Sequence, residues 1–565
     1  MALFRRNTLC IARKSDEIRA QIFQKMPKAN CAVLPKLYRI SFWGYNHDIS
    51  TKESRKPVKS LTVSKMNLRR IAPWLILLLG LLARLWLFGE VPGGLNQDEA
   101  FAGYEAWSLL HSGMDTAGYR FPVYLTAWGS GMNALETYLM IPWIALFGLK
   151  VWVIRLPQLL MALLSLWVVF LLGRRLWGER AGLLCLLLTA LCPWHILLSR
   201  WGLESNLAPG LLLFALYFFV RGLDDERCYP LSALCYGLSL YAYATIWPFV
   251  PLILLIECVA AIMWKKLRLN RWLFLSFAIL AVFAAPLLLF LAVNLDRIGE
   301  IRTPFFSIPK LLYFRSGEMS FRSIPDNFRN LMQILITQSD GLAWNTAGAF
   351  GLLYPITLPF SLAGLIVCLI KLKKEPENVL ILANLLAGLL LGLLIHVNVN
   401  RVNILFFPLI LLAARGLDWL CGRWKPLLVA VLAVYLLFFA FFEQYYFTDY
   451  RRTMDYNFGE GLEEALAAIP DDGSIVTVSD TVKYPRVLFY TQTPTERFRG
   501  TVSYKRYPAA YLDAASFDRW RFGIDTHNPD AGRIYILSPW DDSTAFREAG
   551  FEMTRFGIYT VAKMP

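Results

Sequence analysis

The segment NQDEAFAGYEAW at 96–107 presents three carboxylates, Asp98, Glu99 and Glu105, shortly after an apolar run at 71–89. A carboxylate can accept the proton of a hydroxyl while that hydroxyl attacks a substrate, which typically contributes about 10²–10⁴ in rate. The adjacent Asp98 and Glu99 are therefore catalytic candidates. A structural role is the alternative, because Asp at a helix start caps the helix and stabilises it by about 1 kcal/mol. Both interpretations of Asp98 stay open on helix logic alone.

The same segment has the pattern of an amphipathic helix. Phe101, Tyr104 and Trp107 recur at helical spacing, whereas Asp98 and Glu105 are seven residues apart and share a polar face. We expect the helix to lie on a membrane surface, with its acids turned toward the active side.

The composition indicates the class of protein to which this helix belongs. Of the 565 residues, 56% are hydrophobic and 18% are charged, and the mean hydropathy is +0.44. Apolar runs must dominate such a chain, which is an α-helical, multi-pass membrane protein. About eleven runs are candidate membrane spans, near 71–89, 156–172, 181–196, 207–220, 231–247, 248–264, 272–293, 351–370, 379–395, 402–420 and 426–442.

Basic loops set the orientation of these runs. If the short apolar segment at 135–149 lies in the interface instead of crossing, the basic loops share one side with the amino terminus, which the positive-inside rule assigns to the cytoplasm. Those loops are at 173–180, 221–227, 265–271, 371–374 and 422–425. The domain predicted to span the membrane, 66–442, then has external loops at 90–155 and 294–350, and the tail 443–565 is also outside.

The two ends of the chain differ in character. Residues 1–65 carry fourteen Lys and Arg against four Asp and Glu, about +10 of the formal net charge of +15. We expect a basic cytoplasmic tail facing anionic lipid, either disordered or upstream of a true start at Met66, and no nucleic-acid partner. Residues 443–565 read as a small α/β domain, with a helix at EGLEEALAAIP and strands at SIVTVSD, RIYILS and IYTVAK.

Two stretches carry a family resemblance. QDEAFAGYEAWSLLHSG at 97–113, followed by a short interfacial helix ending LFGL, and VIRLPQLLMALLSLWVVFLLGRRLWGERAGLL at 153–184 together resemble the GT-C glycosyltransferases of the protein O-mannosyltransferase and aminoarabinose transferase (ArnT-like) type. The resemblance is strong over about 70–220, extends more weakly to about 420 and does not cover the ends. It implies a GT-C fold and inverting transfer of a sugar from a polyprenyl phosphate to an acceptor hydroxyl on the extracytoplasmic face.

The resemblance also implies roles for particular residues. Asp98 and Glu99 match the acidic pair of the first external loop, with Asp98 as the base. Similar enzymes carry an arginine at about the position of Arg401, whose guanidinium can hold phosphate by a two-point contact. The alternative for Arg401 is an anchor that snorkels to the interface. Relatives often have Lys-Pro-Pro before the interfacial helix, whereas this chain has WGSGMNALETY, so contacts made there are expected to differ.

Other polar residues are candidates for donor or acceptor contacts. Lys310 and Arg315 are candidates for donor phosphate, although basic residues among aromatics also anchor interfacial segments. The turn YAYATIWP at 241–248 is interpreted as such an aromatic belt and not as a sugar platform. The candidates for sugar or acceptor binding are Glu105, His195, Arg200, Glu204, Asn206, His396 and Asn400.

No motif requires a cofactor. If Asp98 and Glu204 converged, they would be able to hold a divalent cation, but one acid per loop is thin support and no CxxC or Cys/His cluster is present. We predict a metal-independent enzyme, with a divalent metal as the alternative.

Two other functions compete with glycosyl transfer. A transporter or flippase of lipid-linked sugars has a similar topology, although coupled transport commonly places charges near the midplane, where this chain has few. A cell-envelope glycan polymerase or ligase shares the donor chemistry and differs in its acceptor. The expected partners are a polyprenyl-phosphate sugar, a protein, lipid or glycan acceptor, and membrane lipids. A cysteine-free exterior favours a bacterial plasma membrane and an undecaprenyl donor.

Overall fold

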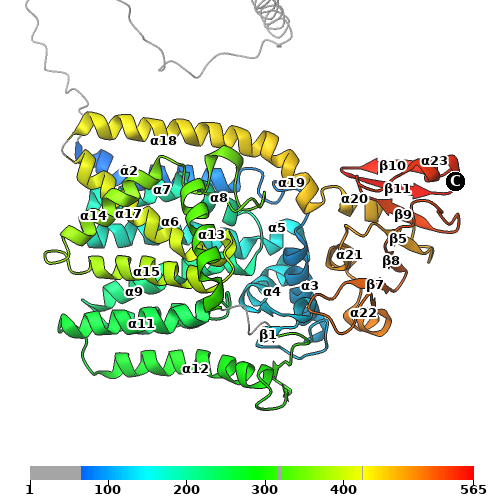
Figure 1. The fold of residues 1–565 in the computed structure, drawn as a ribbon, viewed down its shortest axis with the longest axis horizontal. Coiled ribbons are helices and arrows are strands. Elements are labelled where there is room, and N and C mark those ends of the chain that lie inside the picture. Colours follow the sequence, from blue (N-terminus) through cyan, green and yellow to red (C-terminus); the bar gives the residue numbers. More distant parts are fainter. Residues whose placement is uncertain (1–64, 315–319, 423) are drawn as a thin grey trace, which may run out of the picture. The chain divides into compact units, whose positions relative to one another are not determined.

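The computed structural model describes residues 65–314, 320–422 and 424–565. The predicted basic tail lies, except for Lys65, outside the described residues, as does the candidate Arg315. The described chain is mostly helical, and every apolar run predicted to cross the membrane contains a helix (Figure 1). These helices are α2 (Lys65–Leu85), α6 (Leu156–Trp177), α7 (Glu179–Leu191), α9 (Leu207–Gly222), α10 (Tyr229–Ser239), α11 (Ile246–Met263), α12 (Arg271–Asn294), α14 (Thr357–Ile370), α15 (Asn378–Leu394), α17 (Phe406–Cys421) and α18 (Lys425–Tyr445).

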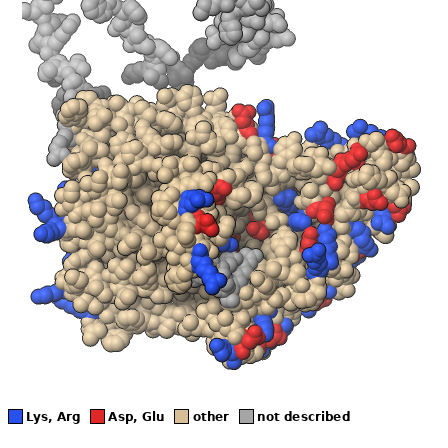
Figure 2. All heavy atoms as spheres, in the orientation of Figure 1, with Lys and Arg blue, Asp and Glu red and all other residues tan. Residues whose placement is uncertain are grey.

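Six helical stretches in the described part of the chain are long and apolar enough to cross a membrane. They are Leu156–Trp177, Glu204–Gly222, Ile246–Met263, Arg271–Asn294, Val399–Cys421 and Lys425–Phe458. Only 22% of the apolar window in α12 and 17% of that in α18 is buried inside the protein, so both helices expose apolar sides. Figure 2 shows the same face of the molecule: charged side chains gather over the C-terminal domain, while most of the helical region has none. The number of spans stays a prediction.

Glycines set the closest helix contact. A Cβ at Gly364 of α14 would lie 1.8 Å from the carbonyl oxygen of Leu412, and one at Gly416 of α17 would lie 2.1 Å from that of Phe360. Only a residue without a side chain allows two helix backbones to approach so closely.

Shorter elements connect the long helices. The predicted first external loop, between α2 and α6, holds α3 (Gln97–Ser112), β1 (Tyr124–Leu125), η1 (Ala127–Gly129), β2 (Met132–Asn133), α4 (Leu135–Phe147) and α5 (Val151–Ile154). The loop that follows α12 holds β3 (Ile301–Arg302), β4 (Ser307–Ile308), η5 (Phe321–Ser323), α13 (Ile324–Thr337) and η6 (Gly348–Phe350). The remaining connections hold α8 (Pro193–Leu198), η2 (Glu204–Asn206), η3 (Glu226–Cys228), α16 (Val399–Val402) and η7 (Asn403–Leu405).

The C-terminal segment contains a seven-stranded mixed sheet in the order β10-β11-β9-β5-β8-β7-β6. Strand β5 is parallel to β8 and β9, with Val476 opposite Trp520 and Ile534, and the other pairs are antiparallel. The predicted helix is α20, and the three predicted strands are β5, β9 and β11. The elements are η8 (Tyr446–Tyr450), α19 (Arg451–Phe458), α20 (Leu462–Ala467), β5 (Val476–Val478), α21 (Tyr484–Thr491), α22 (Thr495–Thr501), β6 (Ser503–Tyr504), β7 (Ala514–Phe517), β8 (Trp520–Phe522), β9 (Ile534–Leu537), α23 (Thr544–Glu548), β10 (Glu552–Phe556) and β11 (Tyr559–Lys563).

Helix α3 packs against this C-terminal domain (Figure 1). Phe101 and Tyr104 are buried, the Tyr104 hydroxyl donates to the carbonyl of Thr493, and a Cβ at Gly103 would lie 2.9 Å from the Phe489 ring in α21. Protein and not lipid therefore covers this apolar face, while the position of α3 on a membrane surface stays a prediction. The helix period was correct, but period alone does not say whether lipid or a distant part of the chain covers an apolar face.

Candidate functional site

The N-terminus of α3 positions the two adjacent carboxylates. Asn96 is the cap: its side chain accepts the backbone N–H of Asp98 at 2.9 Å, and its own N–H donates to Glu99 at 3.0 Å. This reciprocal pair is a capping box. The alternative interpretation of Asp98 as the helix cap is wrong, because Asn96 has that role.

Asp98 is partly exposed and its carboxylate lies against an indole. Its Oδ1 accepts the Nε1–H of Trp128 at 3.1 Å. Trp128 is in η1, in the same external loop, and has a left-handed backbone with φ 56°. The carboxylate is thus oriented by a side chain that is 6% exposed.

Glu99 points into the protein instead. It forms a fully buried ion pair with Arg155, with Nη2 to Oε1 at 2.6 Å and Nε to Oε2 at 3.1 Å. Its Oε2 also accepts the N–H of Gly202 at 2.8 Å. Its buried oxygens are thus occupied by protein donors, which gives Glu99 a structural role here. Arg155, from the Arg-Leu-Pro stretch of the family resemblance, is the residue that holds it.

Two further acids lie near Asp98. Glu204 and Glu136 are both within electrostatic range of Asp98, so the segment between α2 and α6 and the connection between α8 and α9 bring three acids together. The backbone N–H of Asn133 donates to Glu204, and Gln158 Nε2 donates to Glu136 at 2.9 Å. Burial, with some addition from the Glu99 and Asp98 charges, raises the pKa of Glu136 to about 8. Glu136 was missed in the sequence because it stands as a lone acid in an apolar helix.

A cavity of about 430 Å³ opens beside these acids and contains two predicted site residues, Glu204 and Arg401. One part of its lining is apolar and comes from α12 and α15, and the other part is polar. The lining residues are Tyr124, Ser130, Gly131, Asn133, Glu204, Tyr243, Ala244, Thr245, Trp247, Pro248, Leu291, Leu295, Phe314, Leu391, Ile395 and Arg401. The turn YAYATIWP, interpreted as an aromatic belt, supplies five of them and belongs to the candidate site.

The polar part of the cavity has hydrogen-bonding capacity for a ligand. Asn133 is 1% exposed, and within the described chain its Oδ1 has no hydrogen-bond partner. Arg401 is positioned by Asn398, whose Oδ1 accepts its backbone N–H at 2.9 Å, and by a long bond of 3.4 Å from Nη1 to the carbonyl of His396. Asn133 is in the WGSGMNALETY segment, the place where the chain departs from the family pattern.

Three predicted contact residues are buried and bound to protein partners, so the structure gives them structural roles. His195 Nδ1 accepts from Arg84 at 2.7 Å, and both side chains are buried. Arg200 is fully buried and donates to carbonyls at the end of α2, including Arg84 at 3.0 Å and Trp86 at 2.7 Å. The last carbonyls of a helix have no N–H donor within the helix, and the Arg200 guanidinium supplies the missing donors.

Glu105, the third, is 1% exposed and accepts the backbone and hydroxyl of Thr116. Burial, together with the nearby Asp115, raises its pKa well above the usual range. The sequence of α3 alone does not reveal that the turn at Thr116, in the same loop, covers the Glu105 carboxylate and donates to it.

The other predicted residues lie outside the cavity lining. Lys310 pairs with Asp296 and is half-exposed. His396 is exposed and Asn400 is partly exposed, and both are on the connection that carries Arg401. Asn206 is buried beside Glu204, and its Nδ2 lacks a partner among the described residues.

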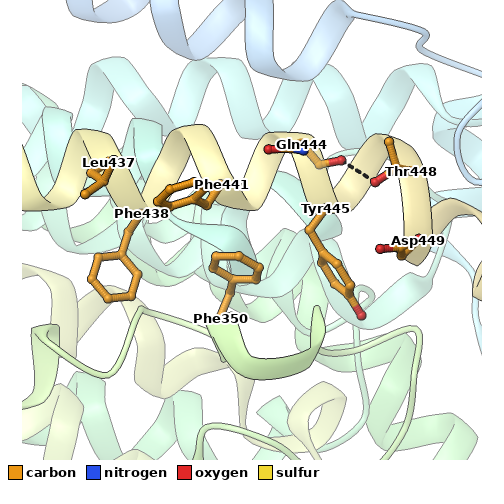
Figure 3. Close-up of a pocket in the computed structure, with 8 residues that line it drawn as sticks. All are labelled: Phe350, Leu437, Phe438, Phe441, Gln444, Tyr445, Thr448 and Asp449. Carbon is orange, nitrogen blue, oxygen red and sulfur yellow. Dashed lines mark hydrogen bonds between the residues drawn. The ribbon is translucent and has the colours of Figure 1, made fainter. Parts of the chain in front are cut away.

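A second cavity, of about 460 Å³, runs along α18 (Figure 3). Phe350, Phe438, Phe441 and Tyr445 form its aromatic walls, and the Thr448 hydroxyl donates to the Gln444 carbonyl at 2.7 Å at one end. None of the predicted site residues lines it. Within the described ranges no group of three or more His, Cys, Asp or Glu side chains is arranged to hold a metal ion.

Comparisons with known proteins found one family match and several solved structures of similar fold. Residues 136–290 match the family described as dolichyl-phosphate-mannose-protein mannosyltransferase. No curated protein matches the sequence. ArnT from Cupriavidus metallidurans in the apo state is 13% identical, with a TM-score of 0.53 over 87% of this chain and 97% of that chain. The structure of the same protein bound to undecaprenyl phosphate is also 13% identical, with a TM-score of 0.52 over 88% of this chain and 98% of that chain.

Identity at this level shows the fold, and the matched coverage extends over most of both chains. The resemblance noted in the sequence is confirmed: the chain has the GT-C fold of membrane glycosyltransferases of the ArnT and protein mannosyltransferase type.

Proposed function

We propose that the protein transfers a sugar from a polyprenyl-phosphate donor to an acceptor hydroxyl at the extracytoplasmic face of a bacterial plasma membrane, without a metal cofactor. The observation that carries the proposal is the 430 Å³ cavity, which joins Arg401 and Glu204 to apolar helix ends beside Asp98. A lipid-linked sugar has matching parts, since it combines an isoprenoid chain, a phosphate and a polar ring. The ArnT structure with undecaprenyl phosphate shows that a protein of this fold binds a polyprenyl phosphate, which is the lipid part of such a donor.

Each part of the cavity has a role in binding the donor. Arg401 engages the phosphate, because a guanidinium supplies two parallel donors and fixed positive charge where the leaving group gains negative charge. Leu291, Leu295 and Ile395 face the first isoprenoid units. Asn133 and Glu204 take sugar hydroxyls, since a buried amide oxygen without a partner gains a hydrogen bond when a hydroxyl reaches it.

Asp98 supplies the base. The acceptor hydroxyl attacks the anomeric carbon, its proton passes to Asp98, and the bond to the phosphate oxygen breaks, so the configuration at the anomeric carbon inverts. Trp128 holds the carboxylate by a hydrogen bond to Oδ1, and a carboxylate placed within reach of the acceptor hydroxyl can take its proton. Glu136, with a pKa near 8, is neutral at pH 7 and limits the negative charge of the acid group.

The test uses the purified full chain in nanodiscs with a panel of undecaprenyl- and dolichyl-phosphate sugars and hydroxyl acceptors. Release of polyprenyl phosphate is followed, and the product's anomeric configuration is determined by NMR. We expect turnover with one donor class and inversion of configuration. Retention of configuration would exclude the single displacement at Asp98. Movement of the lipid-linked sugar between leaflets without release of phosphate would replace the proposal with a flippase.

A further inference from the structure

One loop of the C-terminal domain reaches the residue that orients Asp98. The loop, residues 505–513, connects β6 to β7. The ring of Tyr511 stacks on the indole of Trp128, with centroids 4.6 Å apart and planes 12° from parallel. Beside it, the backbone N–H of Leu512 donates to the Trp128 carbonyl at 2.8 Å. The loop therefore contacts both the side chain and the backbone of Trp128.

Trp128 needs such support because of its backbone conformation. A bulky residue at φ 56° is an outlier that persists only where its surroundings hold it. The adjacent Gly129 is held as well: its carbonyl accepts the N–H of Tyr313 at 2.9 Å, and a Cβ there would lie 2.9 Å from the carbonyl oxygen of Ala509. Two loops from distant parts of the sequence thus close on the η1 turn.

The same loop contacts the residue next to Asp98. The Tyr511 hydroxyl donates to Gln97 Oε1 at 3.3 Å, while Trp128 Nε1 donates to Asp98 at 3.1 Å. Tyr511 thus contacts Gln97, which precedes Asp98, and Trp128, which binds the Asp98 carboxylate, but it does not line the cavity. It is suited to fix where the carboxylate points.

We propose that Tyr511 of the C-terminal domain is a positioning residue that acts through Trp128 to hold the Asp98 carboxylate in its productive orientation. The inference rests on the proposed function, because it concerns the base of that reaction. A general base must lie within about 2.6–3.2 Å of the atom whose proton it takes, and misplacement by about 1 Å costs about 100-fold in rate. The C-terminal domain is therefore part of the catalytic machinery and not an appended module.

The experiment compares kcat and donor affinity of full-length variants in nanodiscs. Tyr511→Ala removes the stacking ring at a side chain that is 40% exposed, Tyr511→Phe keeps the ring, and Trp128→Phe keeps an aromatic ring but loses the N–H. Tyr507→Ala is the matched control, since Tyr507 is in the same loop, is 66% exposed and stacks on Tyr504 instead. Melting temperatures show that each variant is folded, and Tyr511→Leu replaces the alanine variant if it is not.

We expect Tyr511→Ala and Trp128→Phe each to lower kcat by about tenfold with unchanged donor affinity. Tyr511→Phe and Tyr507→Ala should stay within about twofold of wild type. The double variant Tyr511→Ala/Trp128→Phe should also fall by about tenfold, because the two changes interrupt one connection. A double variant whose kcat is about 100-fold below wild type would mean that the two residues act independently, which would overturn the inference. Wild-type kcat in Tyr511→Ala would overturn it as well.

Asp98→Asn separates this inference from the proposed function. If that variant loses turnover while Tyr511→Ala does not, only the positioning role fails. If Asp98→Asn turns over like wild type, the assignment of Asp98 as the base fails, whatever Tyr511→Ala does, and absence of turnover in the wild type would be the failure of the proposed function itself.

Discussion

The two carboxylates at the start of α3 lie in two contrasting regions. Glu99 lies in a buried region with three fully buried arginines. There Arg84 donates to His195, Arg155 donates to Glu99 and to carbonyls, and Arg200 donates to carbonyls. Asp98, its neighbour in the sequence, is partly exposed beside the acids at the 430 Å³ cavity. Both regions contain acids and arginines, but the hydrogen-bond partners of these side chains differ.

The partners of Arg155 and of Asn133 illustrate the difference. A buried charge is tolerated only when its partners replace water, and Arg155 has Glu99 with the carbonyls of Pro92 and Gly94 at 2.8 Å each. Such a residue has nothing left for a ligand. At the cavity, Asn133 Oδ1 has no partner in the described structure, so a hydroxyl can supply one. Arg155 thus has a structural role, and Asn133 is expected to bind a ligand.

The largest effect is expected in the buried region around Glu99. Arg155→Met leaves Glu99 buried without its counter-ion, which we expect to lower the free energy of unfolding by about 3–5 kcal/mol. Arg174→Met is the control, because Arg174 pairs with Glu179 at 4.0 Å with both side chains about half-exposed, a contact that contributes about 0–1 kcal/mol. Thermal unfolding in detergent measures both losses, and equal losses would remove the distinction between the regions.

A smaller effect on binding is expected at the cavity. Arg401→Lys keeps the charge but loses the two-point contact, so we expect it to fold normally and to bind a polyprenyl-phosphate sugar about tenfold more weakly. Lys310→Ala should change the affinity less than twofold, since Lys310 is half-exposed, pairs with Asp296 and lies outside the cavity lining. Titration of donor lipid in nanodiscs gives both affinities. Unchanged affinity in Arg401→Lys would make Arg401 an anchor.

The smallest effect is a pH dependence of stability from Glu136. Its folded pKa of about 8 is above its usual value of 4.5, so the folded protein holds more protons than the unfolded chain between these values. Its contribution to stability is thus lost as pH rises from about 4.5 to 8. Glu136→Gln should melt like wild type at pH 4.5 and be more stable at pH 8, by at least about 1 kcal/mol.

Melting curves across this pH range measure the effect, and the exposed Glu179→Gln is the control. A pH slope in Glu136→Gln that matches wild type would show that this carboxyl is ionised in the folded protein. Turnover at pH 7 should stay within about threefold, because Gln resembles the neutral acid.

Local and periodic features were predictable from the sequence. Apolar runs predicted the helices, and alternation predicted β5, β9 and β11, because these signals depend on neighbouring residues. Asp98, Glu204 and Arg401 were chosen from the resemblance and from their places beside the spans. The covering of Phe101 and Tyr104 by α21 was not predictable, because almost 390 residues separate Tyr104 from Thr493.

The roles of Glu99, His195 and Arg200 depend on such distant contacts too. Each has the residue type expected in an active site, and only the fold shows that its hydrogen bonds are already made. Asn133 and the 241–248 turn were missed for the converse reason, since neither carries a charge that marks a site. Composition thus identifies chemically capable residues, while burial and partners decide which of them meet a ligand.

The most direct measurement compares Asp98→Asn with Glu99→Gln for turnover and melting temperature in one nanodisc preparation. Both substitutions remove a carboxylate and keep its shape. We expect Asp98→Asn to lose about 10²–10⁴ in turnover with unchanged melting temperature and donor binding. Glu99→Gln should lower the melting temperature, because Arg155 loses its counter-ion. Wild-type turnover in Asp98→Asn would contradict the account.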